Sequence, residues 1–150
     1  TFSKVYGMCG LRVGYGLGSE DFRLAVDRVR QPFSVNSLAQ AGAVEALEHQ
    51  DDVARRVERV VVERLHVEDE LAERGLETTE SQANFSWVAL GDRQEEAVMR
   101  GLGERGVIVR GGAALGAEGY LRVTYGTRDE NDRFLAALDE VLAEVPAATG

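Results

Sequence analysis

The residues best suited to chemistry lie among the first sixteen positions, Thr1-Phe-Ser-Lys-Val-Tyr-Gly-Met-Cys-Gly-Leu-Arg-Val-Gly-Tyr-Gly16. A lysine becomes a useful nucleophile where an anion-binding site orients it against a carbonyl carbon. Thr1, Ser3 and Arg12 can supply hydroxyl and guanidinium donors to a phosphate beside Lys4. A lysine that works beside a phosphate and against an aldehyde indicates pyridoxal phosphate as the cofactor.

Residues 3–15 read S-K-x-x-G-x-x-G-L-R-x-G-Y, which resembles the cofactor-lysine signature of fold-type I aminotransferases. Two other segments, Arg30-Gln-Pro-Phe-Ser-Val-Asn36 and Ser81-Gln-Ala-Asn-Phe85, resemble the histidinol-phosphate aminotransferase branch of that family. Near the other end, Gly106-Val-Ile-Val-Arg110 and Tyr120-Leu-Arg-Val-Thr-Tyr-Gly-Thr127 are similar to the segments that carry the family's paired substrate-binding arginines. The resemblance covers nearly the whole chain.

The resemblance implies roles for the residues at the N-terminal end. Lys4 would hold pyridoxal phosphate covalently and, once released, would move the proton between the substrate Cα and the cofactor. Arg12, together with Ser3 and Thr1, would bind the cofactor phosphate. The cofactor itself would supply the electron sink, while the protein would supply orientation and charge.

The resemblance further implies that Arg122 grips the α-carboxylate of the amino-acid partner with its planar fork of donors. Histidinol phosphate has no such carboxylate, so Arg110 and Arg122 together would hold either its phosphate or glutamate. We therefore expect transamination between histidinol phosphate and 2-oxoglutarate in histidine biosynthesis, by an enzyme that at full length is a cytoplasmic homodimer. Aromatic amino-acid aminotransferases, which act on phenylalanine, share these motifs and are the close alternative.

The same resemblance implies that residues outside this sequence complete the site. Family members carry an upstream half with the aromatic residue on the cofactor ring, the asparagine and tyrosine at its phenolic oxygen and the aspartate at its pyridine nitrogen. We expect the chain to be the C-terminal portion of a longer enzyme, which alone binds the cofactor weakly and turns over little. The alternative from a different class is a non-catalytic α+β fragment or interaction domain, in which Lys4 and the arginines are structural.

The elements that must position these residues follow an α/β pattern, which begins with a short buried strand over residues 11–15. Three helices follow, each marked by a capping residue at its start; a proline ends the first and a glycine closes the third. They are predicted from the Ser19 cap to a stop before Pro32, over 38–49 after an Asn36 or Ser37 cap, and from an Asp51-Asp52 cap to Gly75.

Beyond Gly75 the pattern changes to short strands and helices, with alternating apolar residues over 83–90. The further predictions are a helix over 93–105, a strand over 107–109 ending at Arg110, a flexible loop over 111–119, a strand over 120–125, a helix over 129–145 capped by Thr127, and a disordered tail over 146–150. We therefore predict that residues 1–50 are the end of a large cofactor domain and that 51–150 form a small α+β domain. Together they would be the C-terminal part of a fold-type I transferase.

Composition limits the partners. The formal net charge is −9, which disfavours nucleic acid and anionic membrane surfaces, because phosphate groups are bound by neutralising them with Lys and Arg. No apolar run approaches the roughly 20 residues that span a bilayer. The expected partners are therefore small molecules, an amino donor and a 2-oxo acid. The single cysteine, Cys9, is interpreted either as a reactive thiol near the site or as a small buried residue.

Two weaker patterns each have a plainer interpretation. Gly14, Gly16 and Gly18 follow the predicted strand as a dinucleotide loop would, but their spacing is not G-x-G-x-x-G. His49 and His66 lie far apart in sequence with no second ligand at metal spacing, which favours surface or capping roles over zinc. No metal site is expected.

Overall fold

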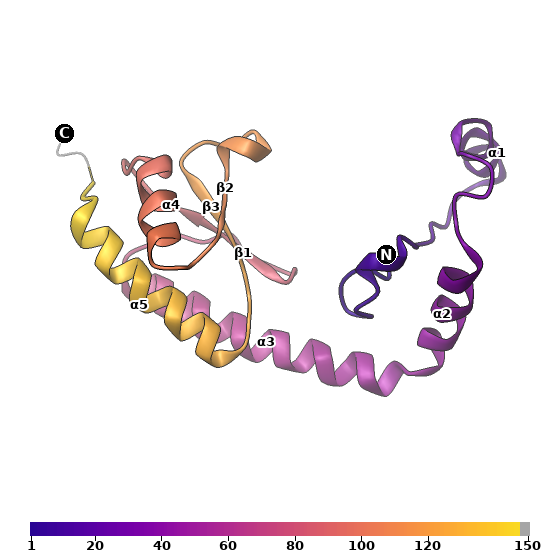
Figure 1. Ribbon diagram of the computed structural model, residues 1–150, viewed down its shortest axis with the longest axis horizontal. Helices are drawn as coiled ribbons and strands as arrows, with labels where there is room; N and C mark the ends of the chain where they lie inside the picture. Colours follow the sequence, from indigo (N-terminus) through magenta and orange to yellow (C-terminus); the bar gives the residue numbers. More distant parts are fainter. Residues whose placement is uncertain (148–150) are drawn as a thin grey trace. The chain divides into compact units, whose positions relative to one another are not determined.

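A computed structural model of the chain describes residues 1–147, in which three helices come first and a small sheet forms between residues 85 and 124 (Figure 1). The chain divides into two compact units, unit 1 over residues 1–58 and unit 2 from residue 59 onward. The predicted assignment of residues 1–50 to a large domain stays a prediction. The elements in chain order are η1 (Cys9–Leu11), α1 (Glu20–Val29), α2 (Ser37–Glu48), α3 (Gln50–Glu73), β1 (Phe85–Ala89), α4 (Glu95–Glu104), β2 (Arg110–Gly111), η2 (Ala113–Leu115), β3 (Tyr120–Thr124) and α5 (Arg128–Glu144).

The helices of unit 1 begin where a short polar side chain can satisfy their first backbone N–H groups. The Ser19 hydroxyl accepts a hydrogen bond from the Phe22 amide at 3.2 Å at the start of α1. Asn36 Oδ1 accepts from the Ala39 amide at 2.8 Å at the start of α2. Both predicted helices are confirmed, and Asn36 is the residue that caps the second.

Residues 11–15 do not form the predicted buried strand. Arg12 has a left-handed backbone, with φ 55°, which interrupts an extended conformation, and Tyr15 is 68% exposed. The apolar alternation in this segment indicates a strand only where a neighbouring strand supplies hydrogen-bond partners. The described residues of the chain supply no such neighbour, so the segment remains irregular and is tied back by one end, through a hydrogen bond from the Phe2 amide to the Val13 carbonyl at 3.2 Å.

Unit 2 is built on an antiparallel sheet with the strand order β1-β3-β2. Burial alternates along β1, where Ser86 and Val88 are buried and their neighbours are half-exposed, so one face of the sheet packs against helices. The second half of α3, α4 and α5 supply the apolar side chains on that face. The buried core comprises Val67, Leu71, Leu76, Val88, Leu90, Val98, Leu102, Leu121, Val123, Tyr125, Phe134, Leu135, Ala137, Leu138 and Val141.

Polar contacts fix α3 alongside α5 within unit 2 (Figure 1). His66 lies 2.7 Å from Asp132, and Arg74 lies 2.7 Å from Asp139. Because the partners advance along both helices in the same direction, α3 and α5 run parallel. Arg74 also contacts Glu70, and its hydrogen bond to Asp139 raises the pKa of the guanidinium above its usual value.

Most of the other predicted elements of unit 2 are confirmed, with ends that differ by a few residues. Gly75, with φ 70°, closes α3, and Thr127 forms a capping box with Glu130 at the start of α5. The predicted strand over 107–109 is wrong, because only Arg110 and Gly111 pair with β3 and Ile108 is 93% exposed. The predicted disordered tail includes residues 148–150, which lie outside the described residues.

Among residues 1–147, no helix is both long enough and apolar enough to cross a membrane.

A buried hydroxyl network joins α3 to the sheet. The Tyr125 hydroxyl lies 2.8 Å from Ser86 Oγ and donates to Glu68 Oε1 at 2.9 Å. Tyr125 is only 8% exposed. Burial, with the neighbouring Glu68 carboxylate as a smaller cause, raises the pKa of Tyr125 to about 12. The hydroxyl therefore stays neutral in the folded chain at pH values where an unfolded tyrosine ionises.

This raised pKa predicts an alkaline loss of stability. The unfolded pKa of tyrosine is about 10, so the stabilisation is complete below about pH 10 and is lost as the pH rises toward about 12. Urea unfolding of the 150-residue chain should show a free energy about 1 kcal/mol lower at pH 11 than at pH 9 through Tyr125 alone. Tyr125→Phe should lack this component. Equal alkaline losses in the two proteins would contradict the assignment to Tyr125.

Candidate functional site

The segment that carries Lys4 is a tight turn organised around Phe2. The Phe2 ring is buried and packs against the rings of Tyr6 and Tyr15, with centroid distances of 4.7 and 5.9 Å. The Phe2 carbonyl accepts a hydrogen bond from the Met8 amide at 3.0 Å, and the Lys4 carbonyl accepts from the Gly7 amide at 2.8 Å. These contacts hold the turn closed while the Lys4 side chain is exposed.

Arg12, Ser3 and Thr1 form one hydrogen-bonded cluster beside this turn. Arg12 Nη1 donates to Ser3 Oγ at 3.3 Å and to the Cys9 carbonyl at 2.7 Å, and the Ser3 amide donates to Thr1 Oγ1 at 3.2 Å. Arg12 reaches this position from a left-handed backbone, a conformation that residues other than glycine adopt uncommonly and that concentrates at functional sites. The structure thus brings together the three residues predicted to bind a phosphate.

Lys4 is the only lysine of the 150-residue sequence. It is adjacent in sequence to Ser3, and so its amine is carried by the same turn as the hydroxyl and guanidinium donors. Cys9, which the sequence left as reactive or buried, is an exposed free thiol in η1 whose carbonyl, not its sulfur, contacts Arg12. The buried interpretation of Cys9 is therefore wrong.

The chemistry of this donor set fits pyridoxal phosphate. A guanidinium and two hydroxyls suit a phosphate dianion, since charge-assisted hydrogen bonds from arginine to phosphate are among the strongest in proteins. An exposed primary amine on the same turn suits an aldehyde carbon. Arg12, Ser3 and Thr1 would thus hold the phosphate, and Lys4 would form the covalent link.

In unit 2 the sheet brings the two predicted substrate arginines together. Arg110 on β2 lies directly opposite Arg122 on β3, so both side chains project from the same face of the sheet. This face is opposite to the one that packs on the helices, because Leu121 and Val123 on either side of Arg122 are buried in the core. Two guanidinium groups side by side on an open face can bind one anionic group between them.

Aromatic rings surround Arg122 on this face. Its guanidinium carbon lies 4.1 Å from the centroid of the Phe85 ring, and its buried Nε has no hydrogen-bond partner among the described residues. Trp87 on β1 lies directly opposite Arg122 and stacks on Tyr120, with a centroid distance of 5.6 Å. A cation held over an aromatic face keeps its charge while losing orientational freedom. Arg122 is therefore fixed in place with donor capacity to spare.

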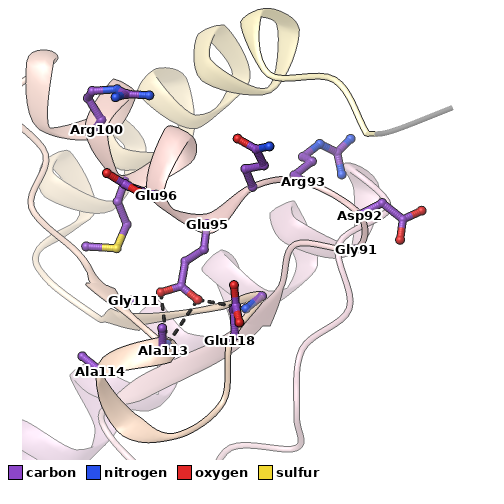
Figure 2. A pocket seen from close by; sticks show the side chains of 13 residues that line it. Gly91, Asp92, Arg93, Glu95, Glu96, Arg100, Gly111, Ala113, Ala114 and Glu118 are labelled. Atoms are coloured by element: carbon purple, nitrogen blue, oxygen red, sulfur yellow. Dashed lines mark hydrogen bonds between the residues drawn. The ribbon is translucent and has the colours of Figure 1, made fainter.

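The loop between the two arginines, predicted to be flexible, is held to α4 by hydrogen bonds. Glu95, at the start of α4, accepts hydrogen bonds from the Ala113 amide at 3.1 and 3.2 Å and from the Gly119 amide at 2.9 Å. Figure 2 shows the Glu95 carboxylate pointing at this loop, and Glu95 is one of the residues that line a pocket of about 1110 Å³. Residues 113–115 also form the 3₁₀ turn η2.

Sequence reasoning missed Phe85, Trp87 and Glu95 as neighbours of the site. Alternation along residues 85–89 placed Phe85 and Trp87 on one face, but the strand register that sets Trp87 opposite Arg122 has no local signal. Glu95 contacts backbone amides 18 and 24 positions later, and nothing in the sequence pattern marks such a partner.

Known proteins match this chain along most of its length. The family model described as aminotransferase class I and II matches residues 1–138. A histidinol-phosphate aminotransferase of Moorella thermoacetica is 42% identical over 143 residues, which cover 95% of this chain and 37% of the relative. An aromatic amino acid aminotransferase of Mycobacterium tuberculosis is also 42% identical, over 135 residues, covering 90% of this chain and 37% of that relative.

A solved structure agrees with these matches. The histidinol-phosphate aminotransferase of Sinorhizobium meliloti, in complex with pyridoxal-5'-phosphate, superposes with a TM-score of 0.80 at 30% identity and covers 96% of this chain and 40% of its own. The chain thus spans well under half the length of the relatives that it matches. The chain therefore belongs to the class I and II aminotransferases, a family of enzymes that depend on pyridoxal phosphate.

Proposed function

We propose that this chain supplies the cofactor lysine and the substrate-binding arginines of a histidinol-phosphate aminotransferase. The observation that carries the proposal is the presence of two clusters in the same chain. One is the turn that carries Lys4, Arg12, Ser3 and Thr1, and the other is the Arg110–Arg122 pair. The relatives are longer than this chain. We therefore propose that this chain is part of a full-length enzyme as long as its relatives, and that the rest of that enzyme supplies the remaining cofactor contacts. We propose further that it works as a cytoplasmic homodimer, with residues 1–50 in its large domain.

The proposed mechanism assigns each side chain a task. Pyridoxal phosphate, when bound, supplies the electron sink that acidifies the substrate Cα–H bond. Arg12, Ser3 and Thr1 bind its phosphate and so fix its position relative to Lys4. The neutral Lys4 amine would act as the general base that removes the proton from the substrate Cα. The protonated amine would then act as the general acid that delivers this proton to the aldehyde carbon of the cofactor.

Arg122 and Arg110 orient the substrate by its anionic group. The open face that carries them presents two guanidinium forks, which can bind a carboxylate of glutamate or 2-oxoglutarate and can also neutralise a phosphate. A single pair of this kind accommodates both substrates of the two half-reactions, since histidinol phosphate carries a phosphate where glutamate carries carboxylates. This is the feature that favours histidinol phosphate as the amino donor.

A second candidate function rests on the aromatic neighbours of the arginine pair. Phe85, Trp87 and Tyr120 lie on the same face as Arg122, and an aromatic ring of a substrate can pack against such side chains. Aromatic amino-acid transamination is therefore the alternative activity, and relatives of both kinds have the same identity to this chain.

Steady-state kinetics of the full-length enzyme decide between these substrates. With 2-oxoglutarate as the common acceptor, kcat/KM is compared for histidinol phosphate and for phenylalanine. The proposal expects the higher kcat/KM with histidinol phosphate. A preference for phenylalanine would assign the enzyme to the aromatic branch, and no transamination with either donor, at full cofactor loading, would favour the non-catalytic alternative.

The arginine pair gives a further prediction. Arg122→Ala should raise KM for 2-oxoglutarate about 10- to 100-fold, the equivalent of one or two lost charge-assisted hydrogen bonds. Arg110→Ala should raise KM more for histidinol phosphate than for phenylalanine, because phenylalanine has no phosphate. Arg100→Ala removes an exposed arginine on α4 and serves as the matched control. Equal kinetics for Arg122→Ala and Arg100→Ala would contradict the role of Arg122.

A further inference from the structure

Glu95 occupies a position that links α4 to the loop between the two arginines (Figure 2). Its carboxylate accepts hydrogen bonds from the Ala113 amide at 3.1 and 3.2 Å and from the Gly119 amide at 2.9 Å. These amides lie near the two ends of the loop that joins β2 to β3. One side chain therefore closes the loop from both sides, through hydrogen bonds that are strengthened by its charge.

The loop is shaped to receive this carboxylate. A Cβ on Gly111 would overlap Glu95 Oε1, and a Cβ on Gly112 would overlap the Ala117 carbonyl oxygen. The Gly112 amide donates to the Tyr120 carbonyl at 2.7 Å, and the Ala117 amide donates to the Gly112 carbonyl at 2.9 Å. Glycine at position 111 thus lets Glu95 approach the backbone immediately after Arg110.

Arg110 depends on this loop because its own strand is short. β2 comprises only Arg110 and Gly111. Ile108, two residues before Arg110, is almost fully exposed. The strand pairing that sets Arg110 opposite Arg122 is therefore held chiefly at its loop end, where Glu95 acts. β3, in contrast, is paired along its length with β1.

We infer that Glu95 is a positioning residue for the Arg110–Arg122 pair, which fixes the spacing of the two guanidinium groups by clamping the loop between them. The inference rests on the proposed function of that pair as an anion site. In this role Glu95 contacts no substrate and acts through the backbone of residues 111–119.

The sign of the expected effect separates positioning from charge. Glu95 is negative, so removing it should by Coulomb's law alone strengthen anion binding at nearby arginines. Positioning predicts the opposite, because a loosened loop leaves Arg110 without a fixed orientation. Glu96 is the matched control, since it is the next residue in the same helical turn, carries the same charge and is exposed.

The test uses inorganic phosphate as the probe and Trp87 as the reporter. Trp87 is the only tryptophan of the chain and lies opposite Arg122, so phosphate bound by the pair should change its fluorescence. Titrations of the 150-residue chain compare wild type, Glu95→Ala, Glu95→Gln, Glu96→Ala and Arg122→Ala. Amide hydrogen exchange at Ala113 and Gly119 is measured in the same proteins and reports on the loop without reference to any activity.

We expect Glu95→Ala to bind phosphate about tenfold more weakly than wild type, with faster exchange at both amides, as the loss of charge-assisted hydrogen bonds implies. Glu95→Gln keeps one acceptor oxygen and should weaken phosphate binding about threefold. If Glu95→Ala does not fold, Glu95→Gln tests the positioning role in its place. Glu96→Ala should bind as wild type does or slightly more tightly.

Two results would overturn the inference, and they differ in whether the proposed anion site is also contradicted. If wild type binds phosphate through Arg122 and the Glu95 variants bind as well as Glu96→Ala, Glu95 does not position the pair, while the proposed anion site stands. If wild type and Arg122→Ala respond alike to phosphate, the anion site itself is wrong and the inference falls with it.

Discussion

Replacing Lys4 with alanine is expected to reduce transamination by the full-length enzyme by at least about 10²- to 10⁴-fold, the usual contribution of a positioned proton-transfer group. Lys4 is the only lysine of this chain, and the hydrogen-bonded cluster of Arg12, Ser3 and Thr1 lies on the same turn. The loss should fall on kcat rather than on the KM for 2-oxoglutarate, because the arginine pair is untouched. Single-turnover kinetics with pre-loaded cofactor measure this directly.

The control for this prediction is Arg12→Lys, which keeps a positive charge but lacks the planar fork that suits a phosphate. We expect Arg12→Lys to weaken cofactor affinity while retaining turnover at saturating pyridoxal phosphate. A Lys4→Ala enzyme that turns over within tenfold of wild type would show that another amine carries out the proton transfer.

The second large effect concerns the core of unit 2. Leu71 on α3 is 0% exposed, and Leu71→Ala should lower the free energy of unfolding by about 2–5 kcal/mol, through lost burial and the cavity left behind. Leu65 lies on the same helix but is 53% exposed, so Leu65→Ala should change stability by about 0.5 kcal/mol or less. Urea unfolding of the 150-residue chain, followed by circular dichroism, measures both.

This pair of variants tests the packing of α3 directly. Both substitutions replace leucine with alanine in one helix, so helix propensity changes equally in the two proteins. Similar losses for Leu71→Ala and Leu65→Ala would mean that α3 does not present the Leu71 face to the core.

Local chemistry made several elements predictable from the sequence. Asn36, Gly75 and Thr127 mark helix ends because each satisfies, through its own side chain or backbone conformation, groups within a few residues of it. The strands β1 and β3 were predictable because alternation records a buried and an open face. The Lys4 and Arg12 candidates followed from a dense run of chemically suited residues, and their clustering with Ser3 needs only a turn.

The features that the sequence did not predict correctly depend on contacts with distant segments of the chain. Residues 11–15 and 107–109 have strand-like apolar patterns, yet a strand forms only where another segment offers its backbone groups. The register that sets Arg110 opposite Arg122 and Trp87 beside them comes from the whole sheet. The contact of Glu95 with the loop was not predictable because its partners are backbone amides, which every residue but proline possesses.

The proposed function requires that Lys4 is the covalent site of pyridoxal phosphate. Borohydride reduction of the full-length enzyme in the presence of the cofactor, followed by proteolysis and mass spectrometry, locates the pyridoxyl group on a peptide. We expect one pyridoxyl group per chain, on the Lys4 side chain, and none on the same peptide from Lys4→Ala. Stoichiometric labelling at a different lysine, with Lys4 unmodified, would contradict it.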